Sequence, residues 1–101
     1  MFIYNITVKV DSAIADSWLN WMLHEHAPAI LDTSCFIKFQ VLKILELDDS
    51  DGPTYAVQFY ASNMDDYNRY INEFSDQFRT LTANKWGTQV AAFRTLMEVV
   101  H

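Results

Sequence analysis

The sequence predicts an α+β fold in which a four-stranded, antiparallel-type sheet carries two helices on one face. Three observations lead to this fold class. Residues 2–10 alternate between apolar and polar side chains, which is typical of a half-buried strand. Two later stretches, 14–22 and 64–81, repeat apolar residues with the period of an amphipathic helix. Two further apolar runs enclose the segment DDSDG at 48–52, whose composition indicates a turn.

The overall composition indicates the number of domains and excludes some classes of binding partner. A chain of 101 residues, half of them hydrophobic, predicts one domain over 1–101. Seven Lys and Arg against thirteen Asp and Glu give an acidic protein with a net charge of −6 and no basic run. Because binding to phosphate backbones and anionic membranes depends on Lys and Arg, neither nucleic acid nor membrane is expected as a partner.

The cellular compartment is predicted from the cysteine content and the N-terminus. The single cysteine, Cys35, cannot form a disulfide within the chain. The N-terminal residues alternate rather than forming an apolar signal sequence, and no apolar run reaches the roughly 20 residues of a membrane-spanning helix. We therefore expect a cytoplasmic protein.

The first strand and first helix follow each other directly. Asp11 or Ser12 offers a side chain to cap a helix that begins near residue 14. Its apolar arc should enter the core, and it includes Ile14, Trp18, Trp21 and Met22. Pro28 lacks an amide donor and disfavours helical geometry at the residue before it. The helix is therefore expected to end before Pro28, with one short helical turn from 28 to about 32.

The second half of the chain predicts a hairpin, a helix and a last strand. Strands at 36–47 and 54–61 are joined by the DDSDG turn. Ser62 and Asp65 resemble a capping box, and the apolar stripe behind them predicts one helix from about 63 to 84, with a bend possible near Ser75. Gly87 is a helix stop, and residues 90–100 form the last strand.

This element order, β-α-β-β-α-β, is the ferredoxin-like motif. We expect the first and third strands at the centre of the sheet, parallel to each other. The face away from the helices should mix apolar and polar side chains. Two interpretations of that face stay open: an interface where the sheets of a homodimer cover each other, or a cavity between those sheets that holds a small molecule. The predicted ligand-binding or dimer residues on it are Asn5, Thr7, Gln40, Gln58, Tyr60, Arg94 and Glu98.

Five motifs, taken together, resemble an uncharacterised family. They are IYNITVKVD (3–11), W-x-x-W-M (18–22), E-H-x-P (25–28), Y-x-V-Q (55–58) and AFRTLMEVV (92–100). On these motifs the chain resembles domain-of-unknown-function family 4286 over nearly its whole length. That family is similar in architecture to dimeric α+β barrels, which pair two ferredoxin-like sheets face to face. The wider group includes small-molecule monooxygenases, haem-degrading enzymes and isomerases, but the resemblance carries no established activity.

The His24-Glu25-His26 sequence contains residue types found in metal sites and in acid–base sites. Residues i and i+2 lie about 200° apart on a helix, so the two histidines do not share a face and no metal site is predicted. If the helix persists, Glu25 falls within the apolar arc and its pKa rises; if the helix loosens before Pro28, Glu25 turns to solvent. His26 is expected to pack against the following turn or to donate to a backbone carbonyl.

Few other residues are candidates for a chemical role. Arg94 and Glu98, on one side of the last strand, could hold a carboxylate ligand or form a contact between subunits. Cys35 is interpreted as a small hydrophobic residue and Trp86 as the cover of a helix end. Two glycines cannot build a nucleotide-binding loop, the DDSDG turn lacks the ligands of a calcium loop, and the RNA-recognition signatures are absent. No cofactor is expected.

The sequence therefore favours a cytoplasmic homodimer of unknown role over an enzyme, with a small-molecule ligand at the sheet face as a possibility. The alternative is a cofactor-independent monooxygenase or isomerase that uses the cavity at the sheet face, with His26, Glu25 and Arg94 as the catalytic candidates. A regulatory ligand-binding module is a third option. An enclosed volume of about 300 Å³ with one of those three residues pointing into it would favour the enzyme.

Overall fold

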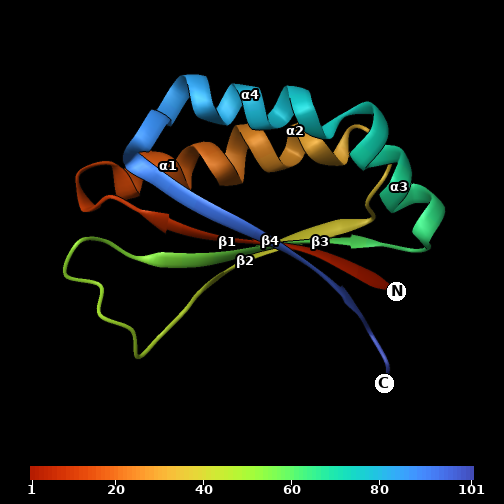
Figure 1. Cartoon of the computed structure of the whole chain (residues 1–101), viewed down its shortest axis with the longest axis horizontal. Coiled ribbons are helices and arrows are strands. Elements are labelled where there is room, and N and C mark those ends of the chain that lie inside the picture. Colours follow the sequence, from red (N-terminus) through yellow and green to blue (C-terminus); the bar gives the residue numbers. More distant parts are fainter.

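The computed structural model describes residues 1–101 and contains one four-stranded sheet with helices on a single face (Figure 1). The strands β1 (Phe2–Val10), β2 (Lys38–Lys43), β3 (Thr54–Ala61) and β4 (Val90–Glu98) lie in the order β2-β3-β1-β4. Helices α1 (Ala15–Trp21) and α2 (Ala27–Leu31) run beside α3 (Met64–Glu73) and α4 (Ser75–Trp86) above the sheet. The predicted ferredoxin-like fold class is confirmed.

The direction of the central strands corrects one prediction. β1 and β3 are central, but they are antiparallel, with Phe2 opposite Ala61 and Lys9 opposite Thr54. Each helical connection returns the chain in the direction of the strand before it, so β2 runs parallel to β1 without touching it. The β2–β3 hairpin then reverses the chain, and β3 must run against β1. The predicted parallel pair was wrong.

The first helical segment continues past the point where Pro28 was expected to end it. A 3-10 turn, capped by the Asp11 side chain, leads into α1. A π-helical turn over Met22–His26 then joins α1 to α2, and the Ala27 amide donates to the carbonyl of Met22 five residues earlier. Pro28 lies in the first turn of α2. Because the wider turn accommodates the proline and its missing donor, the chain bulges rather than breaks.

The second helical segment is divided where a bend was considered possible. Phe74 leaves helical geometry, at φ −125° and ψ −30°, between α3 and α4. Asn63, rather than the predicted Ser62, caps α3 by accepting a hydrogen bond from the Asp66 amide at 2.8 Å. The segment ends at Gly87, as expected.

The core lies between the helices and the sheet and contains the predicted aromatic residues. Trp18, Trp21 and Met22 are all buried. Strand β2 is shorter than the predicted 36–47, because Phe36 turns into the core before the strand begins. The loop over 48–52 folds back on β1, where Lys9 Nζ donates to the Gly52 carbonyl at 2.9 Å.

The register of β4 corrects the predicted faces of the sheet. Arg94 lies opposite Ile6, and Glu98 lies opposite Phe2, on the face that carries the helices. Phe93 lies opposite Thr7 and therefore faces away from the helices. The sequence predicted the reverse, with Arg94 and Glu98 on the open face. The prediction failed because apolar residues do not alternate in this strand, and β4 is an edge strand that buries neither side completely.

Candidate functional site

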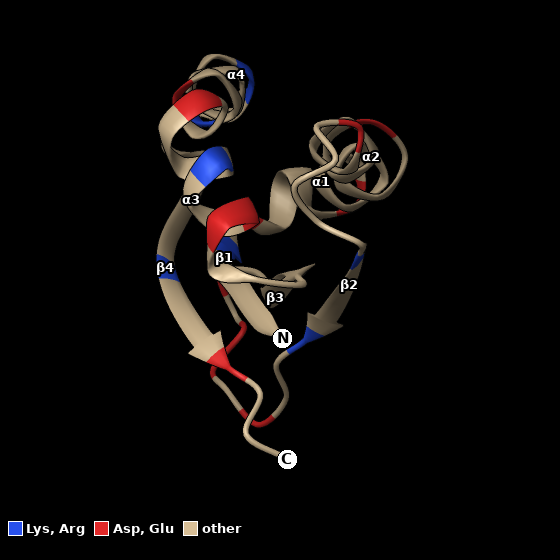
Figure 2. Cartoon of the chain, turned by 90° about the vertical axis from the view of Figure 1, so that its right-hand side faces the viewer, with Lys and Arg blue, Asp and Glu red and all other residues tan.

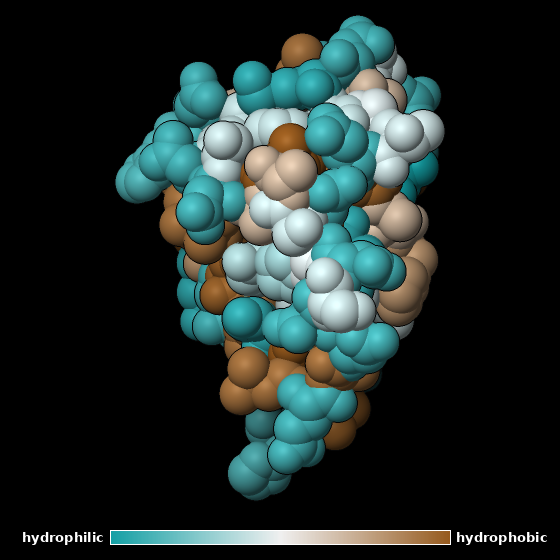
Figure 3. Space-filling view, turned by 90° about the vertical axis from the view of Figure 1, so that its left-hand side faces the viewer, coloured by the Kyte–Doolittle hydropathy of each residue, from teal (hydrophilic) through white to brown (hydrophobic).

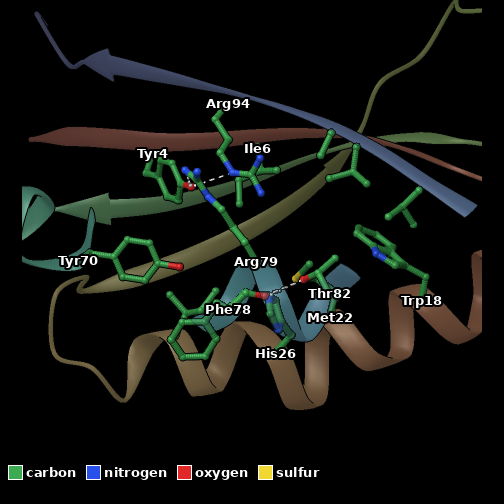
Figure 4. A pocket seen from close by; sticks show the side chains of 14 residues that line it. Tyr4, Ile6, Trp18, Met22, His26, Tyr70, Phe78, Arg79, Thr82 and Arg94 are labelled. Carbon is green, nitrogen blue, oxygen red and sulfur yellow. Dashed lines mark hydrogen bonds between the residues drawn. The ribbon is translucent and has the colours of Figure 1, made fainter. Parts of the chain in front are cut away.

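A small cavity lies between the sheet and the helices and collects polar side chains from distant parts of the sequence (Figure 4). Its volume is about 40 Å³, close to the share of one water molecule. Most of the wall is apolar, from Ile6, Val8, Trp18, Met22, Ile30, Phe78, Val90 and Ala92. The polar groups are Tyr4, His26, Tyr70, Arg79, Thr82 and Arg94.

Two arginines meet at the hydroxyl group of Tyr4. Arg94 Nε donates to Tyr4 Oη at 3.0 Å, and Arg79 Nη2 donates to the same oxygen at 3.5 Å. The hydrogen bond to Tyr4 raises the pKa of Arg79 above its usual value. The Tyr4 ring itself is buried against aromatic rings that include Phe36 and Tyr70. The buried Tyr4 side chain therefore links α4 to β4 through its hydroxyl group. Burial also raises the pKa of the neighbouring Tyr70 phenol.

His26 forms the other polar end of the cavity. Its ring stacks on Trp21 with centroids 4.2 Å apart and meets the edge of Phe78, and its Nε2 lies 3.4 Å from Thr82 Oγ1. The Thr82 hydroxyl donates its single proton to the Phe78 carbonyl, so the hydrogen bond to His26 requires a proton on Nε2. Burial lowers the pKa of His26 to about 4, and the imidazole is neutral at pH 7. The predicted carbonyl partner of His26 was wrong.

The π-helical turn separates His26 from Glu25. His26 is buried, whereas Glu25 is exposed, in agreement with the expectation that the helix geometry changes before Pro28. Glu25 lines a groove of about 380 Å³ on the outer side of the helices, together with Trp21 and Lys85. His26 lies in the wall between this groove and the inner cavity. His26 therefore lines both the outer groove and the inner cavity, whereas Glu25 lines only the outer groove.

The open face of the sheet carries a row of amides. Gln58 Nε2 donates to Asn5 Oδ1 at 3.2 Å, and Gln40 Nε2 donates to Gln58 Oε1 at 3.1 Å. Thr7 accepts from Asn5, and the Tyr60 hydroxyl donates to Gln58. Five of the seven residues predicted for this face thus form one hydrogen-bonded network, and Arg94 and Glu98 lie on the opposite face.

A groove of about 550 Å³ lies beside the amide row and is lined mainly by apolar residues, among them Ile44, Leu47 and Phe93. Figure 3 shows apolar side chains, in brown, gathered toward the lower part of this side of the molecule. None of the three predicted catalytic candidates lines this groove. Arg94 and His26 line the inner cavity instead, on the helix side of the sheet.

Cys35 and Trp86, the other residues interpreted from the sequence, contribute to packing. Cys35 is buried and Trp86 packs its edge against Trp21 at the end of α4, as predicted. No group of three or more His, Cys, Asp or Glu side chains is placed to hold a metal ion. Lys and Arg residues are scattered along the helices and strands (Figure 2). None of the helices has the length and apolar character needed to cross a bilayer.

Sequence reasoning missed four residues of the cavity, Tyr4, Tyr70, Arg79 and Thr82. A helical-wheel signal was available for two of them, since Arg79 and Thr82 are three residues apart on α4 and lie next to the apolar stripe. Tyr4 and Tyr70 were assigned to the apolar faces of their elements, where a hydroxyl group gives no separate signal. Their convergence depends on tertiary packing.

Lowering the pH should destabilise the protein through His26. Its folded-state pKa, about 4, is below the unfolded value of 6.5, so the folded state binds fewer protons. The stabilisation is present above pH 6.5 and is lost as the pH falls towards 4; it amounts to about 3 kcal/mol at 1.36 kcal/mol per pKa unit. Urea unfolding from pH 7.5 to 4 would measure it.

Two variants separate His26 from the other groups that titrate in acid. His26→Gln should flatten the fall in unfolding free energy between pH 6.5 and 4, whereas His24→Gln, at an exposed position two residues away, should leave it unchanged. Parallel profiles for wild-type protein and His26→Gln would contradict the assignment.

Comparisons with known proteins agree with the ferredoxin-like fold. The family model described as "Domain of unknown function (DUF4286)" matches residues 1–100. No curated protein matches the sequence. A dimeric ferredoxin-like protein from an uncultured marine organism is similar in structure, with a TM-score of 0.75, 12% identity, and coverage of 99% of this chain and 95% of that one.

Two other solved structures share the fold. A candidate antibiotic biosynthesis monooxygenase from Deinococcus radiodurans has a TM-score of 0.71 and 13% identity, covering 100% of this chain and 94% of that one. A mutant of MhuD with two manganese protoporphyrin IX molecules bound per active site has a TM-score of 0.62 and 17% identity, covering 98% of this chain and 95% of that one. At such low identities the similarity shows the fold alone.

Proposed function

The chain belongs to the DUF4286 family of domains of unknown function, and we propose that it binds a small organic molecule in the cavity between its sheet and its helices. The observation that carries the proposal is the convergence of Tyr4, His26, Arg79 and Arg94 on one mainly apolar cavity. A few polar groups placed among apolar walls are the usual composition of a ligand site. The four residues come from β1, the π-helical turn, α4 and β4.

Ligand binding requires the cavity to widen, because its 40 Å³ is far below the roughly 300 Å³ of a typical ligand pocket. Arg79 and Arg94 are exposed, long side chains that line the cavity. They can change rotamer without disturbing the buried rings, and rotamer changes of this kind are common on binding. An incoming ligand would displace them from Tyr4 and enter between α4 and β4.

The open face of the sheet is proposed as the interface of a cytoplasmic homodimer. It exposes large apolar side chains, including Leu42 and Phe93, the latter 64% exposed. The amide row supplies both donors and acceptors, so it can meet the same row of a second copy across a two-fold axis. The dimeric state named for one structural neighbour supports this proposal.

A second candidate is a cofactor-independent monooxygenase or isomerase that uses the same cavity. The observation that favours it is the neutral imidazole of His26, whose unprotonated Nδ1 can accept a proton, in the wall of a cavity with two guanidinium groups able to stabilise an anion. His26→Gln would separate the two candidates, since it should abolish turnover in an enzyme and preserve ligand retention in a binding protein.

Native mass spectrometry of freshly purified protein tests the proposal directly. The expected species has twice the 11.8 kDa chain mass and carries a retained small molecule. Ala92→Leu, which places a larger side chain in the cavity wall, should keep the dimer and lose the retained mass. A monomer would contradict the homodimer, and equal retention by Ala92→Leu would contradict the location of the site.

A further inference from the structure

We infer that the ligand carries a carboxylate group, held by Arg79, Arg94 and Tyr4. The inference rests on the proposed cavity and adds the chemical class of the ligand. Arg79 reaches the Tyr4 hydroxyl from α4, and Arg94 reaches it from β4, as Figure 4 shows. The Tyr4 oxygen accepts both hydrogen bonds, and its own proton donates to no acceptor in the structure. Three donors thus converge at one place without an anion.

A shortage of acidic residues does not explain why Arg79 and Arg94 lack an acidic partner. The chain has thirteen Asp and Glu residues and a net charge of −6. The only other arginine, Arg69, pairs with Asp66 at 3.7 Å and donates to two backbone carbonyls. Arg79 feels the charge of Asp76, one turn back on α4, but forms no ion pair with it. The two cavity arginines are therefore held near each other without a carboxylate in a chain rich in carboxylates.

Electrostatics favour an anion at this point. Two guanidinium groups bound to one oxygen repel each other. A carboxylate between them would remove the repulsion and accept hydrogen bonds from both, a geometry that guanidinium groups match well. The Tyr4 hydroxyl could then donate its free proton to the same carboxylate.

The rest of the cavity wall indicates what the part of the ligand beyond the carboxylate should be. Behind the three donors the wall is formed by apolar side chains such as Val8, Trp18 and Ile30. His26 and Thr82 bond to each other at the far end, so they need no polar partner from the ligand. Once Arg79 and Arg94 have moved and the cavity has widened, its apolar wall favours an organic acid with a compact apolar body, about the size of one aromatic ring. Benzoate is a suitable probe, and benzamide is its neutral counterpart of the same shape.

The test is a titration of isotope-labelled protein with benzoate and with benzamide, followed by NMR shifts of the backbone amides of α4 and β4. Wild-type protein should bind benzoate at least about tenfold more tightly than benzamide, the order expected when charge-assisted hydrogen bonds are lost. Arg79→Gln and Arg94→Gln should each weaken benzoate binding by about tenfold and change benzamide binding little. Lys43→Gln, which removes one exposed positive charge outside the cavity, should change neither.

The outcomes separate this inference from the proposed function. If benzamide shifts the cavity amides and benzoate binds no better, the cavity binds small molecules but the carboxylate inference is wrong. If neither probe shifts those amides, the inference is overturned together with the proposed location of the site. If sulfate at the same concentration produces the benzoate shifts and the same dependence on Arg79 and Arg94, the arginines bind any anion and the assignment to an organic acid fails.

Discussion

Replacing Trp18 by alanine should lower the free energy of unfolding by about 3–5 kcal/mol, the range for truncating an aromatic residue in a core. Trp18 is 1% exposed, and its indole stacks on Tyr55 of β3 with ring centroids 5.3 Å apart. The Trp18 side chain therefore packs α1 against the sheet. No neighbouring side chain is free to fill the space, because the residues around it are themselves part of the core. Urea unfolding at neutral pH measures the loss.

Two controls define what the Trp18 result means. Trp18→Phe keeps part of the stacking surface and should lose less than half as much stability. Leu81→Ala, at a leucine that is 53% exposed on α4, should stay within about 0.5 kcal/mol of the wild-type protein. A loss near zero for Trp18→Ala would contradict a core role for the residue and the packing of α1 on the sheet.

The elements with a clear period could be predicted from the sequence. The bounds of β1 and β3 match the predicted 2–10 and 54–61, because each strand has one buried and one open face and turn residues at its ends. The helical stripe over 64–81 likewise corresponds to α3 and α4. The period failed in β4, where Leu96 and Met97 are adjacent apolar residues on opposite faces. An edge strand does not impose the alternation that assigns a face.

Pro28 shows how tertiary packing outweighs a local rule. The proline lacks a donor, as predicted, and the regular α-helix does change geometry before it. The chain nevertheless stays helical, because Ala27 and Ile30 on the following turn are almost completely buried. The π-helical turn lets these residues reach the core and brings His26 onto Trp21. No pattern in the sequence distinguishes such a bulge from a helix end.

Of the polar residues in the candidate site, only His26 and Arg94 were identified from the sequence. The two residues were identified as candidates on separate grounds, and the alternative function placed them at a cavity on the open face of the sheet. Their meeting in one cavity depends on the register of β4 and on the packing of α4, which supplies Arg79 and Thr82. The position of the amides on the open face was predicted correctly, since they lie in strands whose alternation is regular.

Phe93→Asp should convert the proposed homodimer into a monomer at micromolar concentration. Phe93 is 64% exposed in the single chain and lies on the open face opposite Thr7, close to the amide row. Aromatic residues at the centre of an interface contribute strongly to binding, and a carboxylate buried there without a partner costs about 3–5 kcal/mol. The dissociation constant should therefore rise by about a hundredfold or more. Sedimentation velocity over a concentration series measures the change.

Leu96→Asp is the matched control, and it also tests the register of β4. Leu96 is 41% exposed on the same edge strand but faces the helix side, opposite Tyr4, so its substitution should leave the dimer intact. If both variants remain dimeric, the open face is not the interface. If Leu96→Asp dissociates and Phe93→Asp does not, the contact surface includes the other side of β4, the side that holds Arg94. The pair thus decides whether the second copy covers the amide row or the mouth of the ligand cavity.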